Sequence, residues 1–346
     1  MTAPDDQVAR RKDAHLDVVL QKDVLSRGLA TGLGEFTLEY DALPELDLAD
    51  VDVGVELLGR RLRAPILVGA MTGGTERAGR INRTLARAAA RAGVGMALGS
   101  QRAMVARPEL TSTFQVKDAA PDLPLLFGNV GAVQLNYGVG SREVKTLLEA
   151  VGADALNLHL NALQEAVQPE GDTNFAGLAP KMRRLIEEIG VPVLAKEVGA
   201  GIGRRAATKL AELPLAGVEA AGVGGTSWAK VESYRAPADS AQAVVGQRLA
   251  GFGIRTSESI QLCRAAFGDR VVVGSGGVRT GMDIAVAIAL GADVAALARP
   301  LLEAAEESED AAVLALETLI YELRVICFCT GARTVRGLRD VALRTV

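Results

Sequence analysis

Three polar residues, Asn157, His159 and Asn161, alternate with leucines, and Gln164-Glu165 follows at once. Alternation places the three side chains on one side of an extended strand. A polar row of this kind would be costly in a core unless a polar ligand occupied the adjacent space. The single carboxylate of Glu165 cannot enclose Mg²⁺, but it can hold an ion that substrate phosphates and water also bind. The segment therefore predicts a site for a phosphorylated ligand and its metal ion.

Two glycine-rich turns could bind phosphate through their backbone N–H groups. Residues 276–279 (GGVR) close one predicted strand and open a helix, so the turn and the helix dipole could both face an anion. Residues 224–226 (GGT) follow the preceding strand, and the two loops could close on the same phosphate. Turns of this composition also connect strands to helices without any ligand.

The segment 70–74 (AMTGG) has no bulky polar side chain, so a planar ring could lie against its backbone. That property suits a flavin, although a tight turn before a helix would use the same residues. Lys196 ends another apolar run and needs a partner if it is buried. It could form a Schiff base, as in an aldolase, or hold the electron-rich edge of a flavin ring. Glu197 is an unsuitable partner because adjacent residues of a strand face opposite sides.

Basic residues could bind a second polyanion at two places. Arg11-Lys12 lies near the N-terminus, whereas Arg102 follows Ser100 and Gln101 at the end of a predicted strand. An exposed pair of charges is most often a solvated surface, so Arg102 is the stronger candidate.

These residues need a framework that brings them together, and the sequence predicts a barrel. Short apolar runs with Gly-rich ends alternate with segments of helical periodicity. The runs cover residues 65–69, 94–98, 123–130, 154–160, 192–198, 215–220, 271–274 and 293–298. Helices are predicted over 80–92, 177–189 and 280–290, the last capped by Thr280. The expected fold is an α/β protein, a (β/α)8 TIM barrel with an N-terminal extension.

A doubly wound open sheet has the same alternation of strands and helices. The polar residues favour the barrel, because they follow the carboxyl ends of the strands, where barrel enzymes build their sites. These residues are Thr72, Ser100, Asn129, His159, Lys196, Thr226 and Arg279. Residues 1–60 are expected to form the extension, with its basic segment, and residues 61–346 the barrel. The stretch 228–254 is too long for an ordinary connection and is expected to form a lid.

The composition argues against several classes of protein. The 346 residues, 49% of them hydrophobic, can bury a large core. A net charge of −4 with only 1 Trp, 4 Tyr and 7 Phe argues against a nucleic-acid binder. Three cysteines without a redox or zinc spacing fit a reducing cytosol. Since no apolar stretch suits a signal peptide or a membrane span, we expect a soluble, cytoplasmic protein.

Taken together, these motifs resemble one family, the type 2, FMN-dependent isopentenyl-diphosphate isomerases. The resemblance runs from about residue 10 to Arg333. The glycine-rich pieces recur among FMN-binding barrels, whereas the Asn/His/Gln-Glu segment is much more specific. The motifs that carry it are Arg11-Lys12-x-x-His15, AMTGG at 70–74, Ser100-Gln101-Arg102, Asn157-x-His159-x-Asn161-x-x-Gln164-Glu165, GGTSW at 224–228 and SGGVRTG at 275–281.

The resemblance implies a set of roles for individual residues. FMN would contact Ala70, Met71, Thr72, Ser100, Asn129, Lys196 and Thr226, with its phosphate held by Gly276, Gly277, Arg279 and Ala298. The diphosphate substrate would be bound by Arg11, Lys12, Ser100, Gln101, Arg102, His159, Asn161 and Gln164, with Gln164 and His159 as catalytic residues and Glu165 on Mg²⁺. NADPH would reduce the flavin, and the chain would form a homo-oligomer, a tetramer or an octamer. His15 would touch the substrate or position the basic pair.

The implied reaction moves the double bond of isopentenyl diphosphate to give dimethylallyl diphosphate. It adds a proton at one carbon and removes another from its neighbour, through a tertiary carbocation and without net redox change. An unactivated alkene needs a strong acid, a base and a dry pocket, and no side-chain pair of the predicted rim supplies them. Reduced FMN would fill that role. Trp228 would stabilise positive charge or pack as part of the lid, and Glu232 is a candidate proton relay.

Other readings of the same barrel have specific requirements. A 2-hydroxy-acid oxidase, the FMN-dependent oxidoreductase alternative, needs a histidine base late in the barrel, and no histidine follows His159. A nucleotide-monophosphate dehydrogenase or reductase needs a cysteine on a loop, whereas Cys263, Cys327 and Cys329 fall in predicted helical segments. A non-enzymatic ligand sensor would bind without turnover, and the crowded polar rim argues against it.

Overall fold

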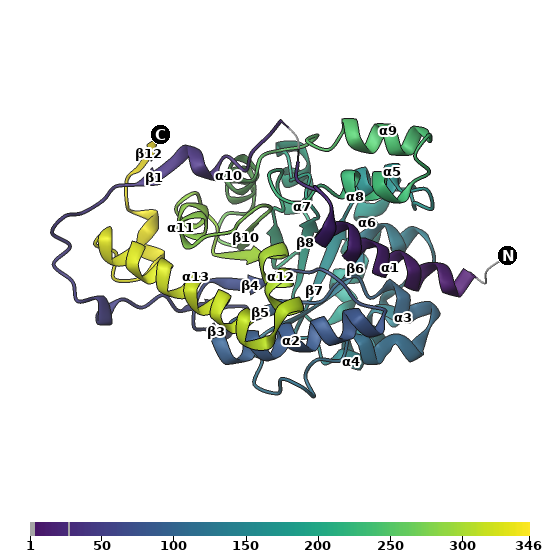
Figure 1. The fold of residues 1–346 in the computed structure, drawn as a ribbon, viewed down its shortest axis with the longest axis horizontal. Coiled ribbons are helices and arrows are strands. Elements are labelled where there is room, and N and C mark those ends of the chain that lie inside the picture. The colour runs from purple at the N-terminus through teal and green to yellow at the C-terminus, as the bar shows by residue number, and fades with distance from the viewer. Residues whose placement is uncertain (1–3, 27) are drawn as a thin grey trace.

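The computed structural model describes the backbone of residues 4–26 and 28–346, and the side chains of residues 12–26 and 28–346. Eight parallel strands close into a barrel, with the last strand paired to the first (Figure 1). This closure confirms the predicted (β/α)8 fold, and every strand overlaps one predicted apolar run. The strands are β4 (Ile66–Val68), β5 (Gly95–Ala97), β6 (Leu126–Gly131), β7 (Ala155–Leu160), β8 (Val193–Glu197), β9 (Gly217–Glu219), β10 (Val271–Ser275) and β11 (Val294–Leu297).

Helices surround the barrel and cover its outer face (Figure 1). They include α2 (Glu76–Ala92), α4 (Ser141–Val151), α6 (Leu178–Ile189), α7 (Arg204–Ala211), α10 (Thr256–Phe267), α11 (Gly281–Ala289) and α13 (Glu309–Cys329). Further helices lie in the connections between strands: α3 (Arg102–Ala106), α5 (Ala162–Val167), α8 (Trp228–Arg235), α9 (Ala241–Arg248) and α12 (Arg299–Glu307). In the described part of the chain, no helix combines the length and the apolar character that a membrane span requires.

Local sequence signals explain where these helices begin and end. The Thr75 hydroxyl accepts a hydrogen bond from the N–H of Ala78 at the start of α2, and Gly93 ends the helix with a φ of 68°. Thr280 caps α11 as predicted, in a reciprocal pair with Asp283. The predicted lid at 228–254 is not an irregular loop, because Ser227 and Ser240 cap α8 and α9 there.

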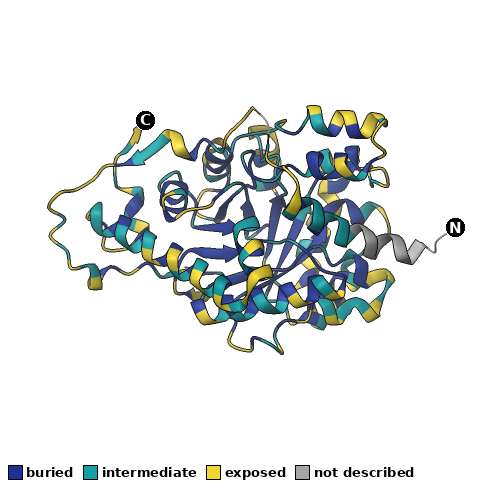
Figure 2. Ribbon diagram, in the orientation of Figure 1, coloured by how far each residue is buried: buried dark blue, intermediate teal, exposed yellow. Residues whose placement is uncertain are grey.

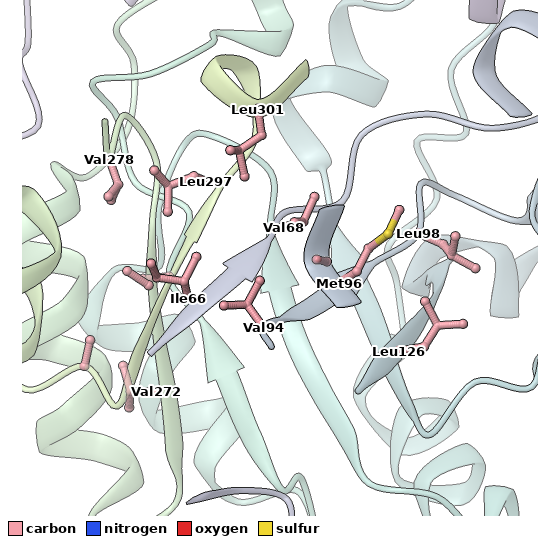
Figure 3. Close-up of a cluster of buried hydrophobic side chains, with 14 of the residues drawn as sticks. Ile66, Val68, Val94, Met96, Leu98, Leu126, Val272, Val278, Leu297 and Leu301 are labelled. Atoms are coloured by element: carbon pink, nitrogen blue, oxygen red, sulfur yellow. The ribbon is translucent and has the colours of Figure 1, made fainter. Parts of the chain in front are cut away.

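Strand residues alternate between two hydrophobic layers. Ile66, Val68 and Met96 face the helices and belong to the larger core, part of which Figure 3 shows. Leu67 and Phe127 face the barrel axis, where they form a second cluster. The strands are therefore buried on both faces (Figure 2), as continuous apolar runs in a parallel sheet require.

A hairpin closes the amino-terminal end of the barrel. Strands β2 (Val55–Leu57) and β3 (Arg60–Leu62) pair with each other, and Leu57 and Leu62 are buried in the inner cluster. The expected boundary between the extension and the barrel, after residue 60, falls within β3. Within the described residues, the hairpin fills this end, and the cavity that could take a ligand lies at the opposite, carboxyl-terminal end.

The N-terminal segment is joined to the barrel by several other contacts. Helix α1 (Pro4–Gln21) lies over the carboxyl-terminal end, and β1 (Phe36–Leu38) pairs with β12 (Leu343–Thr345) from the other end of the chain. The buried ammonium group of Lys230 on α8 binds the Asp23 carboxylate at 2.7 Å. The segment thus packs as part of the barrel structure.

We expect Leu62→Ala to lower the free energy of unfolding by about 2–5 kcal/mol, because it leaves a cavity in the plug of the barrel. Leu62 is 0% exposed, whereas Leu43, the matched control, is 74% exposed. Leu43→Ala should change the stability by less than about 0.5 kcal/mol. Urea denaturation followed by circular dichroism measures both stabilities. Equal denaturation midpoints for the two variants would contradict a stabilising role for the β2–β3 hairpin.

Candidate active site

One large cavity of about 1130 Å³ opens at the carboxyl ends of the strands. Its volume exceeds the roughly 300–1,000 Å³ of a typical small-molecule pocket, so two ligands can fit together. Helix α1 covers it with His15, Leu16 and Val19, and Trp228 and Arg235 of α8 close another side. Among the expected site residues, those that line the cavity are Lys12, Ala70, Met71, Thr72, Ser100, Arg102, Asn129, His159, Asn161, Gln164, Glu165, Lys196, Thr226, Gly276, Gly277, Arg279 and Ala298.

Two of the expected substrate contacts are absent from this set of described lining residues, for different reasons. The side chain of Arg11 lies outside the described residues. Gln101 is 0% exposed: its Oε1 accepts from the N–H of Asn129 at 2.9 Å, and its Nε2 donates to the carbonyl of Leu147. The buried Gln101 therefore positions the β6 loop, and the direct contact expected of it does not fit this geometry. Its place after a strand end gave no sign of the direction in which the side chain points.

The glycines of two loops let their backbones meet at one end of the cavity. Gly277 has a φ of 77°, and a Cβ atom there would lie 2.6 Å from the carbonyl oxygen of Gly224. The N–H groups of Gly277 and Val278 make no hydrogen bond within the described residues. Free donors on a turn without side-chain bulk are what a phosphate needs.

The helix that faces this turn differs from the one expected. The first N–H groups of α11 are already bound, since Gly281 donates to Glu322 at 2.7 Å and Thr280 donates to Asp283 at 3.0 Å. The carboxylates of Asp283 and Glu322 thus occupy the positive end of the α11 dipole, so this helix end is poorly suited to bind a phosphate. Instead, α12 begins at the cavity wall with no side-chain cap on Ala298. Helix N-termini after the last strands of such barrels are suited to bind phosphate, and the start of α12 has this position.

Another wall, residues 70–72, follows β4 and lies close to the neighbouring loop after β5. A Cβ atom on Gly99 would lie 2.4 Å from the carbonyl oxygen of Thr72, so the two strand ends approach as backbone against backbone. Ser100 lines the cavity next to this contact. The wall can accept a planar ring without a displaced side chain.

Lys196 is buried at the cavity floor, but its partner is not a sequence neighbour. Its Nζ donates to the Glu219 carboxylate at 2.5 Å and to the carbonyl of Glu197 at 3.0 Å. Register explains the pair, because β8 and β9 place Lys196 opposite Glu219. The Glu197 carboxylate instead accepts backbone N–H groups of residues 198–201. Sequence reasoning correctly set aside the Glu197 carboxylate but missed Glu219, whose polarity within an apolar run was the available signal.

His159 lies on β7 beside the lysine. Its Nδ1 is 2.7 Å from Asn129 Oδ1, and the Asn129 amide donates to the carbonyl of Leu98. That second bond fixes the amide, so Nδ1 of His159 carries the proton and Nε2 is an acceptor. Burial lowers the pKa of His159 to about 3, and the charges of Lys196 and Lys12 act in the same direction. His159 is therefore a neutral imidazole at physiological pH.

The Asn161-Gln164-Glu165 group stands at the start of α5. Asn161 Nδ2 donates to Glu165 Oε1 at 2.8 Å, and the Asp172 N–H donates to Glu165 Oε2 at 2.7 Å. Burial raises the pKa of Glu165 despite these two bonds, so a cation beside it would stabilise the ionised form. The described residues contain no cluster of three or more His, Cys, Asp or Glu side chains suited to a metal. Glu165 lines the cavity and remains the expected metal ligand.

Arg102, the first residue of α3, reaches the same region. Its guanidinium is 2.5 Å from Asp172 Oδ2, which also accepts from Gln134 at 3.0 Å. Asp172 therefore fixes Arg102 with its side chain and Glu165 with its backbone. It lay in no motif recognised in the sequence, because its role depends on the fold of the loop after α5.

A second carboxylate, Glu232 on α8, joins the extension to the site. It accepts from Gln164 Nε2 at 2.8 Å, contacts His15 Nε2 at 3.0 Å and pairs with Arg235. Burial would raise the pKa of Glu232, but His15, Arg235 and Gln164 outweigh it and hold this pKa at about 2. His15 also meets Trp228 edge to face, with ring centroids 5.2 Å apart. Helix α1 thereby holds Gln164 and Trp228 in position.

Two buried amide oxygens of the β7 segment lack a partner within the described residues. They are Oδ1 of Asn157 and Oδ1 of Asn161. An unsatisfied buried acceptor is costly, and Asn161 lines the cavity. A donor group on a ligand at this wall would satisfy it.

Comparisons with known proteins decide the family. The profile of the FMN-dependent dehydrogenase family matches residues 161–345. An isopentenyl-diphosphate delta-isomerase of Synechococcus sp. is 46% identical over 337 residues, which cover 97% of this chain and 96% of the relative. The chain belongs to the type 2, FMN-dependent family of isopentenyl-diphosphate delta-isomerases. Another isopentenyl-diphosphate delta-isomerase, from Nostoc sp., is 45% identical over 98% of the chain and 96% of the relative.

Solved structures show that this family shares its fold with FMN oxidases. A mandelate oxidase structure with (S)-2-phenylpropionate has a TM-score of 0.67 at 19% identity, covering 100% of this chain and 99% of the other. A second mandelate oxidase structure, with 3,3-difluoro-2-hydroxy-3-phenylpropionic acid, has a TM-score of 0.67 at 18% identity and covers 99% of this chain and 98% of the other. At this identity the likeness establishes the barrel alone.

The cavity suits FMN, the cofactor of the family. The free N–H groups at 277–278 and the uncapped α12 fit its phosphate, and the wall at 70–72 fits a planar ring. Lys196 lines the same cavity.

We expect His159 to stay unprotonated between pH 5 and pH 8 in the folded protein. Burial lowers the pKa of His15 and brings that of His159 to about 3, from an ordinary value of 6.5. Because the folded pKa is the lower one, the unfolded chain binds protons first, and the protein should lose stability as the pH falls below 6.5. Nitrogen-15 NMR should give a neutral His159 with its proton on Nδ1, and a His15→Asn variant assigns the signals. A titration of His159 near pH 6.5 would contradict this.

Proposed function

We infer that this protein converts isopentenyl diphosphate to dimethylallyl diphosphate by proton transfer with reduced FMN. One observation carries the proposal. The Asn161-Gln164-Glu165 group, Lys12 and Arg102 line the same cavity as a phosphate-binding turn and a flat wall. A cofactor phosphate and a substrate diphosphate can thus occupy opposite ends, with their reactive parts between them. The 46% identity to a relative named for this reaction supports it.

The cofactor end is formed by residues at the ends of seven strands. The N–H groups of Gly277 and Val278, the guanidinium of Arg279 and the start of α12 would hold the FMN phosphate. The ring would lie against 70–72, with Ser100, Asn129 and Thr226 at its polar edges and Lys196 on its electron-rich edge. Bound in reduced form, FMN supplies the acid–base chemistry that no side chain of the cavity provides.

The substrate end combines charge with a metal ligand. Lys12 and Arg102 would bind the diphosphate, and Glu165 would hold Mg²⁺ against it. His159 would take part through the acceptor Nε2, for example toward a water on the metal or a protonated phosphate oxygen. Asp172 keeps Arg102 in place from behind. We propose that Arg11 also binds the diphosphate.

The reacting carbons would lie between these two ends, under Gln164. The amide of Gln164 is fixed at its Nε2 by Glu232 and at its Oε1 by Asn161, 3.2 Å away. A fixed amide dipole orients the alkene and limits how it can move during proton transfer. Leu16, Val19 and Trp228 exclude water, and the face of the indole can stabilise positive charge.

We also propose that NADPH reduces the flavin without being consumed at each turnover, since the reaction has no net redox change. Cytoplasmic location and assembly into a tetramer or octamer belong to the same proposal, on the resemblance to the family.

An anaerobic incubation with isopentenyl diphosphate, FMN, Mg²⁺ and NADPH in deuterated water tests the function. Dimethylallyl diphosphate that carries solvent deuterium, formed in large excess over NADPH consumed, is the expected result. NMR follows the product and absorbance follows NADPH. Absence of product while FMN binds and is reduced would overturn the assignment, and a screen of 2-hydroxy acids would then test the oxidase alternative.

Gln164→Ala should leave FMN bound and lower kcat about 100-fold, because the alkene is no longer oriented. Flavin absorbance and fluorescence report binding, and NMR of the product reports turnover. Unchanged turnover would remove Gln164 from the site.

Glu165→Gln keeps the shape of the side chain but removes its charge. The Mg²⁺ concentration for half-maximal activity should rise roughly tenfold or more, because a neutral amide binds a hard cation weakly. Glu187→Gln, an exposed charge change on α6, is the control and should leave the metal dependence unchanged. An unaltered requirement in Glu165→Gln would contradict its role.

A further inference from the structure

At the floor of the cavity, three strands contribute the residues of one buried hydrogen-bonded group. The proposed mechanism gives a role to Lys196 but none to the other two members, Glu219 and Ser275. Glu219 on β9 accepts from Lys196 Nζ at 2.5 Å and from the hydroxyl of Ser275, on β10, at 2.8 Å. The lysine and glutamate side chains are only 9% and 4% exposed. All three residues line the cavity floor.

The hydrogen bonds give this group one orientation. The Ser275 oxygen accepts from the N–H of Ala221 at 3.2 Å, so its own proton points to Glu219. Lys196 uses two donors on Glu219 and on the carbonyl of Glu197. Its third N–H remains for the cavity, where a ligand can meet it. Glu219 is thus held in place by two donors, the ammonium group of Lys196 and the hydroxyl of Ser275.

The charges around Lys196 make Glu219 its counterion. The neighbouring groups that carry or could carry charge are His159 on β7, Lys12 on α1 and Glu197 on β8. His159 is neutral, and the Glu197 carboxylate is occupied by loop N–H groups. Lys12 is a second cation whose charge adds to that of Lys196 at His159. Without Glu219, the floor of the cavity would carry uncompensated positive charge.

We propose that Glu219 is a positioning residue that balances the charge of Lys196 and so keeps the proton on reduced FMN available for transfer. This inference rests on the proposed function, because it needs the flavin ring over Lys196. A lone cation at the electron-rich edge of the ring favours the anionic reduced form, whereas a paired cation favours it less. The reaction donates a proton to an alkene, so the reduced flavin must keep that proton until transfer. A lysine paired with Glu219 suits this role better than an unpaired positive charge.

The test compares the reduced flavin in the wild type and in Glu219→Gln. Glutamine keeps an acceptor for Lys196 and Ser275 but removes the charge, and the reduced ring then gives the lysine an anionic partner. The midpoint potential of bound FMN should become more positive, and the pKa of reduced FMN should fall by about one unit. A reductive titration and the absorbance of the reduced state against pH measure both. Ser275→Ala, which leaves both charges in place, should shift them much less.

Lys196→Met, alone and combined with Glu219→Gln, gives a second test that does not depend on the folding of the single Glu219→Gln variant. Lys196→Met should lower the midpoint potential, because Glu219 is then unpaired, and adding Glu219→Gln to it should restore the potential toward the wild-type value. The proposal is overturned if Glu219→Gln has the wild-type potential and pKa, or if the Lys196→Met protein and the double variant are the same. Failure of the wild-type protein to bind FMN would instead overturn the proposed function.

Discussion

Closure of the eight-stranded sheet is the constraint on which the site depends. Parallel strands of one barrel all end on the same rim, so residues far apart in the chain, such as Thr72, Lys196 and Ala298, line one cavity. The hairpin β2–β3 fills the other end with Leu57 and Leu62. This division leaves an apolar half that stabilises the barrel and a polar half that is free to bind ligands.

Burying ionisable groups at the rim forces each of them into defined partnerships. Lys196 is paired with Glu219, Arg102 with Asp172, and Gln164 with Glu232. Such groups are stable only with hydrogen-bond partners, and those partners fix their orientation. The same burial makes His159 neutral and favours a cation at Glu165. Electrostatics and geometry therefore have a single cause here, the removal of water from the barrel mouth.

The fold is shared with mandelate oxidases, which by their name carry out an oxidation. The difference in this chain lies in its side chains. Its two histidines are His15, on the helix that covers the cavity, and His159, on β7, and no histidine is present on the later strands. The amide of Gln164 and the carboxylate of Glu165 line the cavity, and Lys196 is paired with Glu219. A barrel that binds a redox cofactor can thus be adapted to a reaction without net redox change.

The sequence by itself determined the strands, the barrel and most of the residues at its rim, because apolar period, glycine-rich turns and polar strand ends are local signals. His159, Gln164 and Glu165 could be selected in this way. The tertiary structure alone decided which groups meet. Only register pairs Glu219 with Lys196, only packing turns Gln101 into the core, and only the placement of α12 offers a free helix end where Asp283 and Glu322 have closed that of α11. These contacts join residues distant in the chain, and their geometry depends on the whole barrel rather than on any local pattern.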